Sequence, residues 1–261
     1  DAIRDPLWSR GLGDVYKRQV LRIPIGLSMF LVGAFGTSLI AGWLPIISQL
    51  KTSAWHLFSN YSLSVIPLFL LMGNFAAKAG MSAALFNFAG ACLGHRKGGV
   101  AMAAVGACAG FGAICGSSLA TAATMGKVAL PELRKMGYSN ALSTGALAAG
   151  GTLGILIPPS IVMVVYASAT DVSGGRMFLA GVVPGLLAGF MLMITIYIIA
   201  KIKNLPKGDW QGWSEVIESG RDAIWGLFLI VIILGGIYGG IFTPTEAAAV
   251  ASVYALTLIH I

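Results

Sequence analysis

Two glycine-rich interruptions within apolar sequence constrain the fold of this chain most strongly. The first is GFGAICGSSLAT at residues 110–121 and the second is GGTLGILIPPS at residues 150–160. Within a bilayer every backbone N–H and C=O needs a partner, so membrane-spanning segments are normally continuous helices. Glycine clusters and a Pro-Pro pair open a helix, and paired broken segments are typical of the substrate and ion site of secondary transporters. The sequence therefore predicts a transporter.

The composition places the chain in a membrane. Hydrophobic residues make up 57% of the sequence, charged residues 10%, and the mean hydropathy is +0.84, whereas a soluble domain carries roughly 25% charged residues. Apolar stretches at 23–43, 61–77, 177–200 and 223–242 approach the roughly 20 residues needed to cross a bilayer as a helix. The predicted fold class is an all-α polytopic membrane protein.

The formal net charge of +7 does not indicate a nucleic-acid partner. The basic residues lie in short loops beside apolar spans, which is the pattern of cytoplasmic loops. Three cysteines, Cys92, Cys108 and Cys115, lack metal-ligand spacing and are interpreted as packing thiols.

An enzyme or an ATP-driven pump is disfavoured by missing motifs. The histidines are scattered, and the sequence contains no HExxH, GxSxG or GxxxxGK[ST] pattern. A channel is harder to exclude, because broken helices also build selectivity filters.

The chain divides into a tail, a main body and a short last segment. Residues 1–19 are polar and aperiodic, and we interpret them as a non-native or artefactual tail. A first span is expected at about 20–43, a second ends at residue 77, and a separate amphipathic helix covers 81–93. The sequence stops inside an apolar helix, so we expect a fragment of a longer protein.

Residues 99–130 are expected to form a re-entrant helical hairpin. Central glycines interrupt this segment, and a hairpin would place the basic residues on both sides of it on one face of the membrane. These residues are Arg96, Lys97, Lys127, Arg134 and Lys135. Under that topology most other loop cations fall on the same face, and only Lys78 and Arg176 fall opposite. The asymmetry makes the basic face cytoplasmic.

The remaining segments are a broken helix at about 141–169 and several connections. Loops are expected at Pro131–Asn140 and Lys203–Asp222, the second carrying Trp210 and Trp213 at the membrane interface. In the last segment Thr245 is expected to cap a new helix, with Glu246 favourable near its N-terminus.

The chain resembles the large membrane subunit (the DctM-type permease) of the tripartite ATP-independent periplasmic (TRAP) transporters. The resemblance covers about residues 20–261 and rests on five segments: IPLFLLMGN at 66–74, FGAICGSSLATAATMG at 111–126, GGTLGILIPPS at 150–160, FLAGVVPG at 178–185 and GGIYGGIFTPTEAAA at 235–249. Cys115 is a departure, because the family more often has serine there. The chain length is a second departure, because family members continue through a second, inverted repeat.

The resemblance implies a function and partners. It implies sodium-driven uptake of a C4-dicarboxylate, or a similar carboxylate such as sialic acid, across the bacterial inner membrane. A periplasmic binding protein would deliver the substrate, a smaller membrane subunit would pair with the permease, and sodium would be the coupling ion without another cofactor. It also implies an elevator-type transporter, of which residues 20–242 would be the first repeat and residues 243–261 the start of a truncated second. An ion or solute channel, or an inactive fragment of the permease, stays an alternative.

The two interruptions supply the candidate binding residues. An unwound helix offers sodium its carbonyl oxygens without placing a charge in hydrocarbon. We expect both breaks to face each other and to hold one sodium ion with the substrate carboxylate adjacent, using Gly116, Ser117, Ser118, Gly151, Thr152 and Gly154. Helix capping is the alternative role for Ser117 and Ser118.

Neighbouring residues have simpler expected roles. Pro158 and Pro159 are expected to fix the helix break. Thr121 and Thr124 are expected to hydrogen-bond within their own helix rather than to a ligand. No basic side chain lies near either break in the sequence to bind a carboxylate.

Overall fold

A computed structural model describes residues 25–208, 210 and 212–260. The proposed artefactual tail at 1–19 therefore lies outside the described residues. The chain divides into two compact units, Asp1–Asn60 and Tyr61–Ile261. All regular elements of the described residues are helices, apart from one isolated β-bridge. The predicted all-α class is confirmed.

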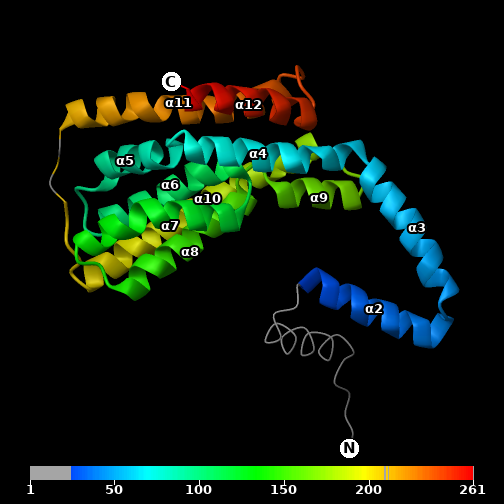
Figure 1. Ribbon diagram of the computed structural model, residues 1–261. Coiled ribbons are helices and arrows are strands. Elements are labelled where there is room, and N and C mark those ends of the chain that lie inside the picture. The colour runs from blue at the N-terminus through cyan, green and yellow to red at the C-terminus, as the bar shows by residue number, and fades with distance from the viewer. Residues whose placement is uncertain (1–24, 209, 211, 261) are drawn as a thin grey trace, which may run out of the picture. The chain divides into compact units, whose positions relative to one another are not determined.

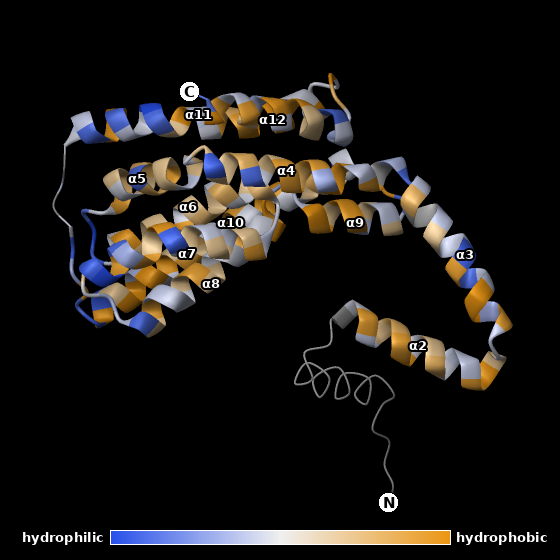
Figure 2. Ribbon diagram, viewed as in Figure 1, coloured by the Kyte–Doolittle hydropathy of each residue, from blue (hydrophilic) through white to orange (hydrophobic). Residues whose placement is uncertain are grey.

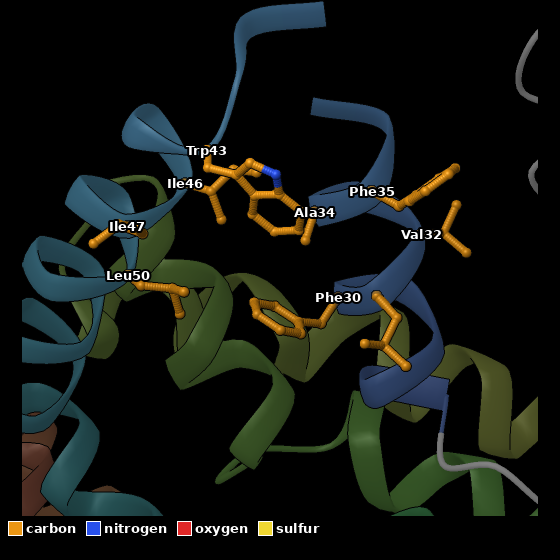
Figure 3. A pocket seen from close by; sticks show the side chains of 9 residues that line it. Phe30, Val32, Ala34, Phe35, Trp43, Ile46, Ile47 and Leu50 are labelled. Carbon is orange, nitrogen blue, oxygen red and sulfur yellow. The ribbon is translucent and has the colours of Figure 1, made fainter. Parts of the chain in front are cut away.

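Unit 1 contributes two helices, α2 (Ile25–Ala41) and α3 (Leu44–Ser59). Between them the chain turns at Gly42, whose φ of +78° lies in the left-handed region that favours glycine. A cavity of about 710 Å³ lies between the two helices and is lined by apolar side chains. Figure 3 shows Phe30 of α2 and Leu50 of α3 directed toward each other across it. Most other apolar side chains of the pair are exposed, as expected for helices solvated by lipid.

Unit 2 holds the remaining helices (Figure 1). They are the 3₁₀ turn η1 (Tyr61–Ser64), α4 (Val65–Lys78), α5 (Met81–Leu93), α6 (Gly99–Cys115), α7 (Ser118–Lys135), α8 (Asn140–Leu156), α9 (Ile161–Ala169), α10 (Gly174–Ile202), α11 (Trp213–Tyr238) and α12 (Pro244–Ile259). Helices α6, α7 and α8 pack against one another, and α10 packs against α6 and α8. Helix α4 lies along α12, and α5 lies along α11.

Several helices of unit 2 are suited to a bilayer. By length and apolar composition α10 and α11 can each cross a membrane as single helices, and the bent pairs α4/α5 and α8/α9 can each do so together. The bends measure 64° and 42° respectively. Apolar residues cover much of the helix surface in Figure 2, while hydrophilic residues gather at the end of unit 2 where α5 ends and α11 begins. Together these features describe a polytopic membrane protein.

Hydrogen bonds join the loops at this end. The Gly208 N–H donates to the Gly94 carbonyl at 3.0 Å. The Tyr138 hydroxyl donates to the Pro206 carbonyl at 3.3 Å. Loops 94–98, 136–139 and 203–208, which flank α5, α7 and α10, are therefore neighbours. Arg134 and Lys135, in the last turn of α7 just before the second loop, thus lie at the same end of unit 2 as Arg96 and Lys97 of the first loop, the arrangement that a hairpin requires.

Two expected boundaries were wrong because tertiary packing outweighed local signals. Helix α7 continues through Pro131 to Lys135, and Leu133 beyond the proline is fully buried. Helix α11 begins at Trp213, within the expected loop, because its buried Ser219 and Ala223 share one face.

Helices α4 and α5 form a bent pair, and Lys78, the last residue of α4, lies at the bend. The expected cap of the last helix was also wrong. Thr243 is the N-cap, with Pro244 following and the Glu246 side chain accepting from the Thr243 N–H at 2.8 Å. This reciprocal capping box requires the acidic residue three positions after the cap, a spacing that Thr245 lacks.

Candidate functional site

The tip of the hairpin is a two-residue break between α6 and α7. Helix α6 ends at Cys115, and Gly116 adopts a left-handed conformation with φ of +63°. Ser117 is extended, and its hydroxyl accepts a hydrogen bond from the Ala120 N–H at 3.4 Å. The chain thus reverses direction with one glycine and one capping serine.

The second break separates α8 from α9. Helix α8 ends at Leu156, and residues 157–160, with Pro158 and Pro159 buried, connect it to Ile161. The Pro158–Pro159 peptide bond is cis. Ser160 precedes α9 in extended conformation, but its hydroxyl makes no capping hydrogen bond. The Ser160 side chain is fully buried, and its Oγ has no hydrogen-bond partner among the described residues.

The two breaks contact each other directly. The Ile161 N–H, at the start of α9, donates to the Gly116 carbonyl at 3.2 Å. A Cβ placed on Gly116 would lie 2.9 Å from the Pro159 carbonyl oxygen, so the two backbones are in contact. An N–H group that the helix start leaves unpaired therefore finds its partner at the hairpin tip.

Glycines allow α8 to lie directly on the hairpin. A Cβ on Gly112 would lie 2.6 Å from the Gly154 Cα. A Cβ on Gly154 would lie 2.8 Å from Thr121 Oγ1 and 3.1 Å from the Ser117 carbonyl oxygen, and one on Gly151 would lie 2.8 Å from the Ala122 Cβ. Real Cβ atoms essentially never approach to under 3.0 Å. The close approach of these helices therefore depends on the absence of side chains.

A small cavity lies beside the tip, between α4 and the hairpin. Its volume is about 60 Å³, enough for a water-sized occupant, and the described residues that line it carry no charge. The polar residues among those lining it are Asn74, Cys115 and Thr124. Among the described residues, no group of three or more His, Cys, Asp and Glu side chains is arranged to hold a metal. The oxygen-bearing side chains among the described lining residues, Asn74 and Thr124, are neutral.

Comparison with known proteins identifies the family. Residues 18–261 match the family model of the tripartite ATP-independent periplasmic transporter, DctM component. The chain belongs to this family.

Similar DctM proteins come from several bacteria, each named a C4-dicarboxylate TRAP transporter large permease protein. The Vibrio cholerae protein is 51% identical over 239 residues, which are 90% of this chain and 52% of that protein. The Pseudomonas aeruginosa protein is 52% identical over 208 residues, covering 80% and 49%. The Rhodobacter capsulatus protein is 42% identical over 223 residues, covering 79% and 51%. The chain thus spans about half the length of these curated relatives, which are permeases and not enzymes.

The structure brings most of the predicted DctM site residues together. Gly116, Ser117, Ser118, Gly151 and Gly154 lie where the hairpin tip meets α8 and the break that follows it. Ser117 and Ser118 are half-buried. Thr152 is the exception, because its side chain is exposed and its hydroxyl donates to the Ala149 carbonyl of the same helix at 2.7 Å.

Two polar features of this region were missed in the sequence. Ser160 ends the second motif, and a serine directly after Pro-Pro and before an apolar helix indicates an N-cap position. Thr121 was expected to bond within its own helix. Its buried Oγ1 instead lies 2.9 Å from Cys115 Sγ, across the hairpin tip. No local pattern indicates that pairing, since it depends on the hairpin turn.

Replacing Cys115 should show how much this pairing contributes to stability. Cys115→Ser keeps a hydrogen-bonding atom beside Thr121 and should leave the thermal midpoint of the purified permease nearly unchanged. Cys115→Ala leaves the Thr121 hydroxyl buried without its partner and should cost about 1–3 kcal/mol. Equal midpoints for both variants would contradict a stabilising role for this contact.

Proposed function

We propose that this chain forms the sodium- and substrate-binding half of a secondary transporter that takes up a C4-dicarboxylate, driven by a sodium gradient, across the bacterial inner membrane. A small membrane subunit and a periplasmic binding protein complete the transporter. The hairpin and the broken helix move together as part of its transport domain.

The proposal rests mainly on the contact between the two helix breaks. Two separated helix interruptions meet in apolar surroundings, joined by the hydrogen bond from the Ile161 N–H to the Gly116 carbonyl. Broken helices at membrane depth are tolerated where they line a binding cavity. The fully buried Ser160 hydroxyl, which has no hydrogen-bond partner in the described part of the chain, supports a ligand at this place, because leaving such a group unsatisfied costs about 1–3 kcal/mol.

Sodium fits the groups that this region offers. The helix break between Leu156 and Ile161 and the hairpin tip present carbonyl and hydroxyl oxygens, which are the neutral hard ligands that alkali ions take from proteins. We assign the ion to backbone oxygens around Gly116, Gly151 and Gly154 and to the hydroxyls of Ser117, Ser118 and Ser160. Thr152 contributes at most through its backbone, because its hydroxyl is bonded within α8.

The substrate assignment follows the names of the relatives. Three proteins at 42–52% identity are named C4-dicarboxylate permeases. A carboxylate next to the sodium ion would face the start of α7, where Leu119 is 83% exposed and the helix dipole favours an anion. The second carboxylate needs a further donor, and none of the side chains lining the cavity beside the tip carries a positive charge.

Uptake into proteoliposomes tests the function. The full-length permease containing this sequence is reconstituted with its small subunit and offered labelled C4-dicarboxylates and sugar acids, with and without a sodium gradient and the binding protein. Saturable dicarboxylate uptake that requires both is the expected result. Uptake that requires neither and does not saturate would favour a channel and overturn the proposal.

A further inference from the structure

A cavity surrounded by basic side chains lies at the loop-rich end of unit 2, away from the two breaks. Its volume is about 530 Å³. It is lined by His95, Arg96, Lys97, Tyr197, Lys201 and Lys207. The residues come from the α5–α6 loop, the last turns of α10 and the loop that follows α10. We refer to this cavity as the basic pocket.

The backbone holds these distant segments together. Lys97 and Lys207 face each other in an isolated antiparallel β-bridge, and next to it the Gly208 N–H donates to the Gly94 carbonyl at 3.0 Å. Gly98, with φ of +74°, packs so closely on α10 that an added Cβ would lie 2.4 Å from the Ala200 Cβ. The basic pocket is therefore formed by packed backbone rather than by side chains that happen to lie near one another.

Among the described residues the lining is strongly positive and has no internal counter-charge. It carries Arg96 and three lysines but no carboxylate. Lys97 Nζ donates to the neutral Asn204 Oδ1 at 3.1 Å. In the described part of the chain the one ion pair, Lys135 with Glu132, lies outside the pocket. Asp209, the acidic residue nearest to the pocket in the sequence, lies outside the described residues. Clustered like charges repel, and a bound anion would relieve that repulsion.

His95 adds a second indication of a ligand. Its ring packs edge-on against Trp210, with ring centroids 4.8 Å apart. The Nδ1 atom of His95 is buried and has no hydrogen-bond partner among the described residues. A buried polar atom without a partner, in a residue that lines the pocket, marks a place where an anion could satisfy it.

The side chains around the basic pocket indicate what kind of anion it binds. Trp210 and Trp213 are exposed next to the pocket, 5.7 Å apart by ring centroids, and tryptophan concentrates at the level of lipid head groups. Exposed apolar side chains run along α10 toward the pocket at a spacing of four residues; they are Ile194, Ile198 and Ile202. Cations, interfacial aromatics and an adjoining apolar helix surface together match an anionic lipid and not a soluble anion.

We propose that the basic pocket binds the phosphate head group of an anionic phospholipid, phosphatidylglycerol or cardiolipin, with the acyl chains along α10. Arg96, Lys97, Lys201 and Lys207 contact the phosphate oxygens, and the His95 ring supplies a further hydrogen-bonding atom. The lipid would tie the loop before α6 to the segment between α10 and α11, and so stabilise the base of the hairpin.

Lipid titration of the purified, delipidated full-length permease tests the proposal. Binding is followed by native mass spectrometry and by the thermal midpoint, with cardiolipin, phosphatidylglycerol or phosphatidylcholine added. The test variant is Lys201→Gln/Lys207→Gln. The matched control is Lys127→Gln/Lys135→Gln, which removes the same charge from exposed positions on α7 outside the pocket.

Each outcome either supports or contradicts lipid binding at the basic pocket. We expect the affinity for cardiolipin to fall about 30-fold in the test variant, as for the loss of two cations near a membrane surface, and to change less than twofold in the control. Equal losses in both variants would show that binding follows net charge alone and would overturn the proposal. So would equal binding of phosphatidylcholine, or displacement of the lipid by inorganic phosphate or glycerol phosphate at similar concentration. None of these measurements depends on uptake, so their results test lipid binding independently of the proposed transport function.

Discussion

Replacing Gly112 by alanine should destabilise the permease and abolish most of its uptake. The new Cβ would lie 2.6 Å from the Gly154 Cα and 3.0 Å from the Gly154 nitrogen. Both are backbone atoms, so no side chain can rotate away, and α8 must shift from α6. Overpacking of this kind typically costs about 1–3 kcal/mol, more than the roughly 1 kcal/mol that alanine gains over glycine in a helix.

The consequence for uptake follows from the position of the contact. Gly154 lies two residues before the end of α8, and the break that follows supplies the Ile161 N–H to the hairpin tip. A shift of α8 would therefore also separate the two breaks that the proposed sodium site requires. Uptake should fall even at temperatures where the Gly112→Ala protein remains folded.

Gly126→Ala is the matched control in the same hairpin. Apart from the backbone of its own helix and its chain neighbours, no described atom lies within 4 Å of a Cβ at Gly126, so only the gain in helix propensity remains. The thermal midpoint of Gly126→Ala should stay the same or rise, whereas that of Gly112→Ala should fall. Shifts of the same sign and size in both variants would contradict the glycine-mediated contact between α6 and α8.

Backbone chemistry explains why the two breaks were visible in the sequence. Glycine clusters and the Pro158–Pro159 pair act locally, and they interrupt a helix wherever the surrounding chain lies. The reversal at Gly116 and the interruption after Leu156 accordingly lie within the two motifs. The association of paired broken segments with the binding site of secondary transporters then added the expectation that both belong to one site.

Side-chain directions could not be predicted in the same way. Whether Thr152 or its neighbours face the hairpin depends on how α8 is rotated against α6 and α7, which is decided by packing between helices. Glycines at 151 and 154 permit close contact, so this face is buried and Thr152 is exposed. The pairing of Cys115 with Thr121 likewise depends on the turn between them, and the basic pocket depends on loops about 110 positions apart.

The start of α11 was not predicted because its first turns are rich in charged residues. Glu215, Glu218, Arg221 and Asp222 give the first turns of α11 the composition of a loop. Residues among and just after them pack inward, with Ser219 and Ala223 buried and Gly220 close to the ring of Phe88. A helix with one polar face and one face of small residues is recognisable only once its packing partner is known.

Ser160→Ala should remove most of the response to sodium without harming the fold. The Ser160 hydroxyl is buried and has no partner among the described residues, so its loss in sodium-free buffer should be neutral or stabilising by about 1 kcal/mol. If the hydroxyl is a sodium ligand, the sodium-dependent rise in the thermal midpoint should shrink. The sodium concentration for half-maximal uptake should increase about tenfold, as for a ligand worth roughly 1.4 kcal/mol.

Two other variants that remove a hydroxyl serve as controls for Ser160→Ala. Thr144 is exposed, and its hydroxyl donates to the Asn140 carbonyl at 2.8 Å within α8. Thr144→Ala therefore reports the loss of an ordinary helix-bonded hydroxyl. Thr152→Ala tests the residue that the sequence favoured, and its exposed position predicts a response close to that of Thr144→Ala.

The order of the three variants separates a binding role from a structural one. A purely structural hydroxyl at Ser160 would change the thermal midpoint equally with and without sodium, whereas a ligand changes only the sodium-dependent part, because an ion that binds the folded protein stabilises it by mass action. Unchanged sodium dependence in Ser160→Ala would remove that hydroxyl from the proposed site. A large effect of Thr152→Ala instead would require α8 to turn its exposed face toward the ion, and would place the binding site outside the contact between the two breaks.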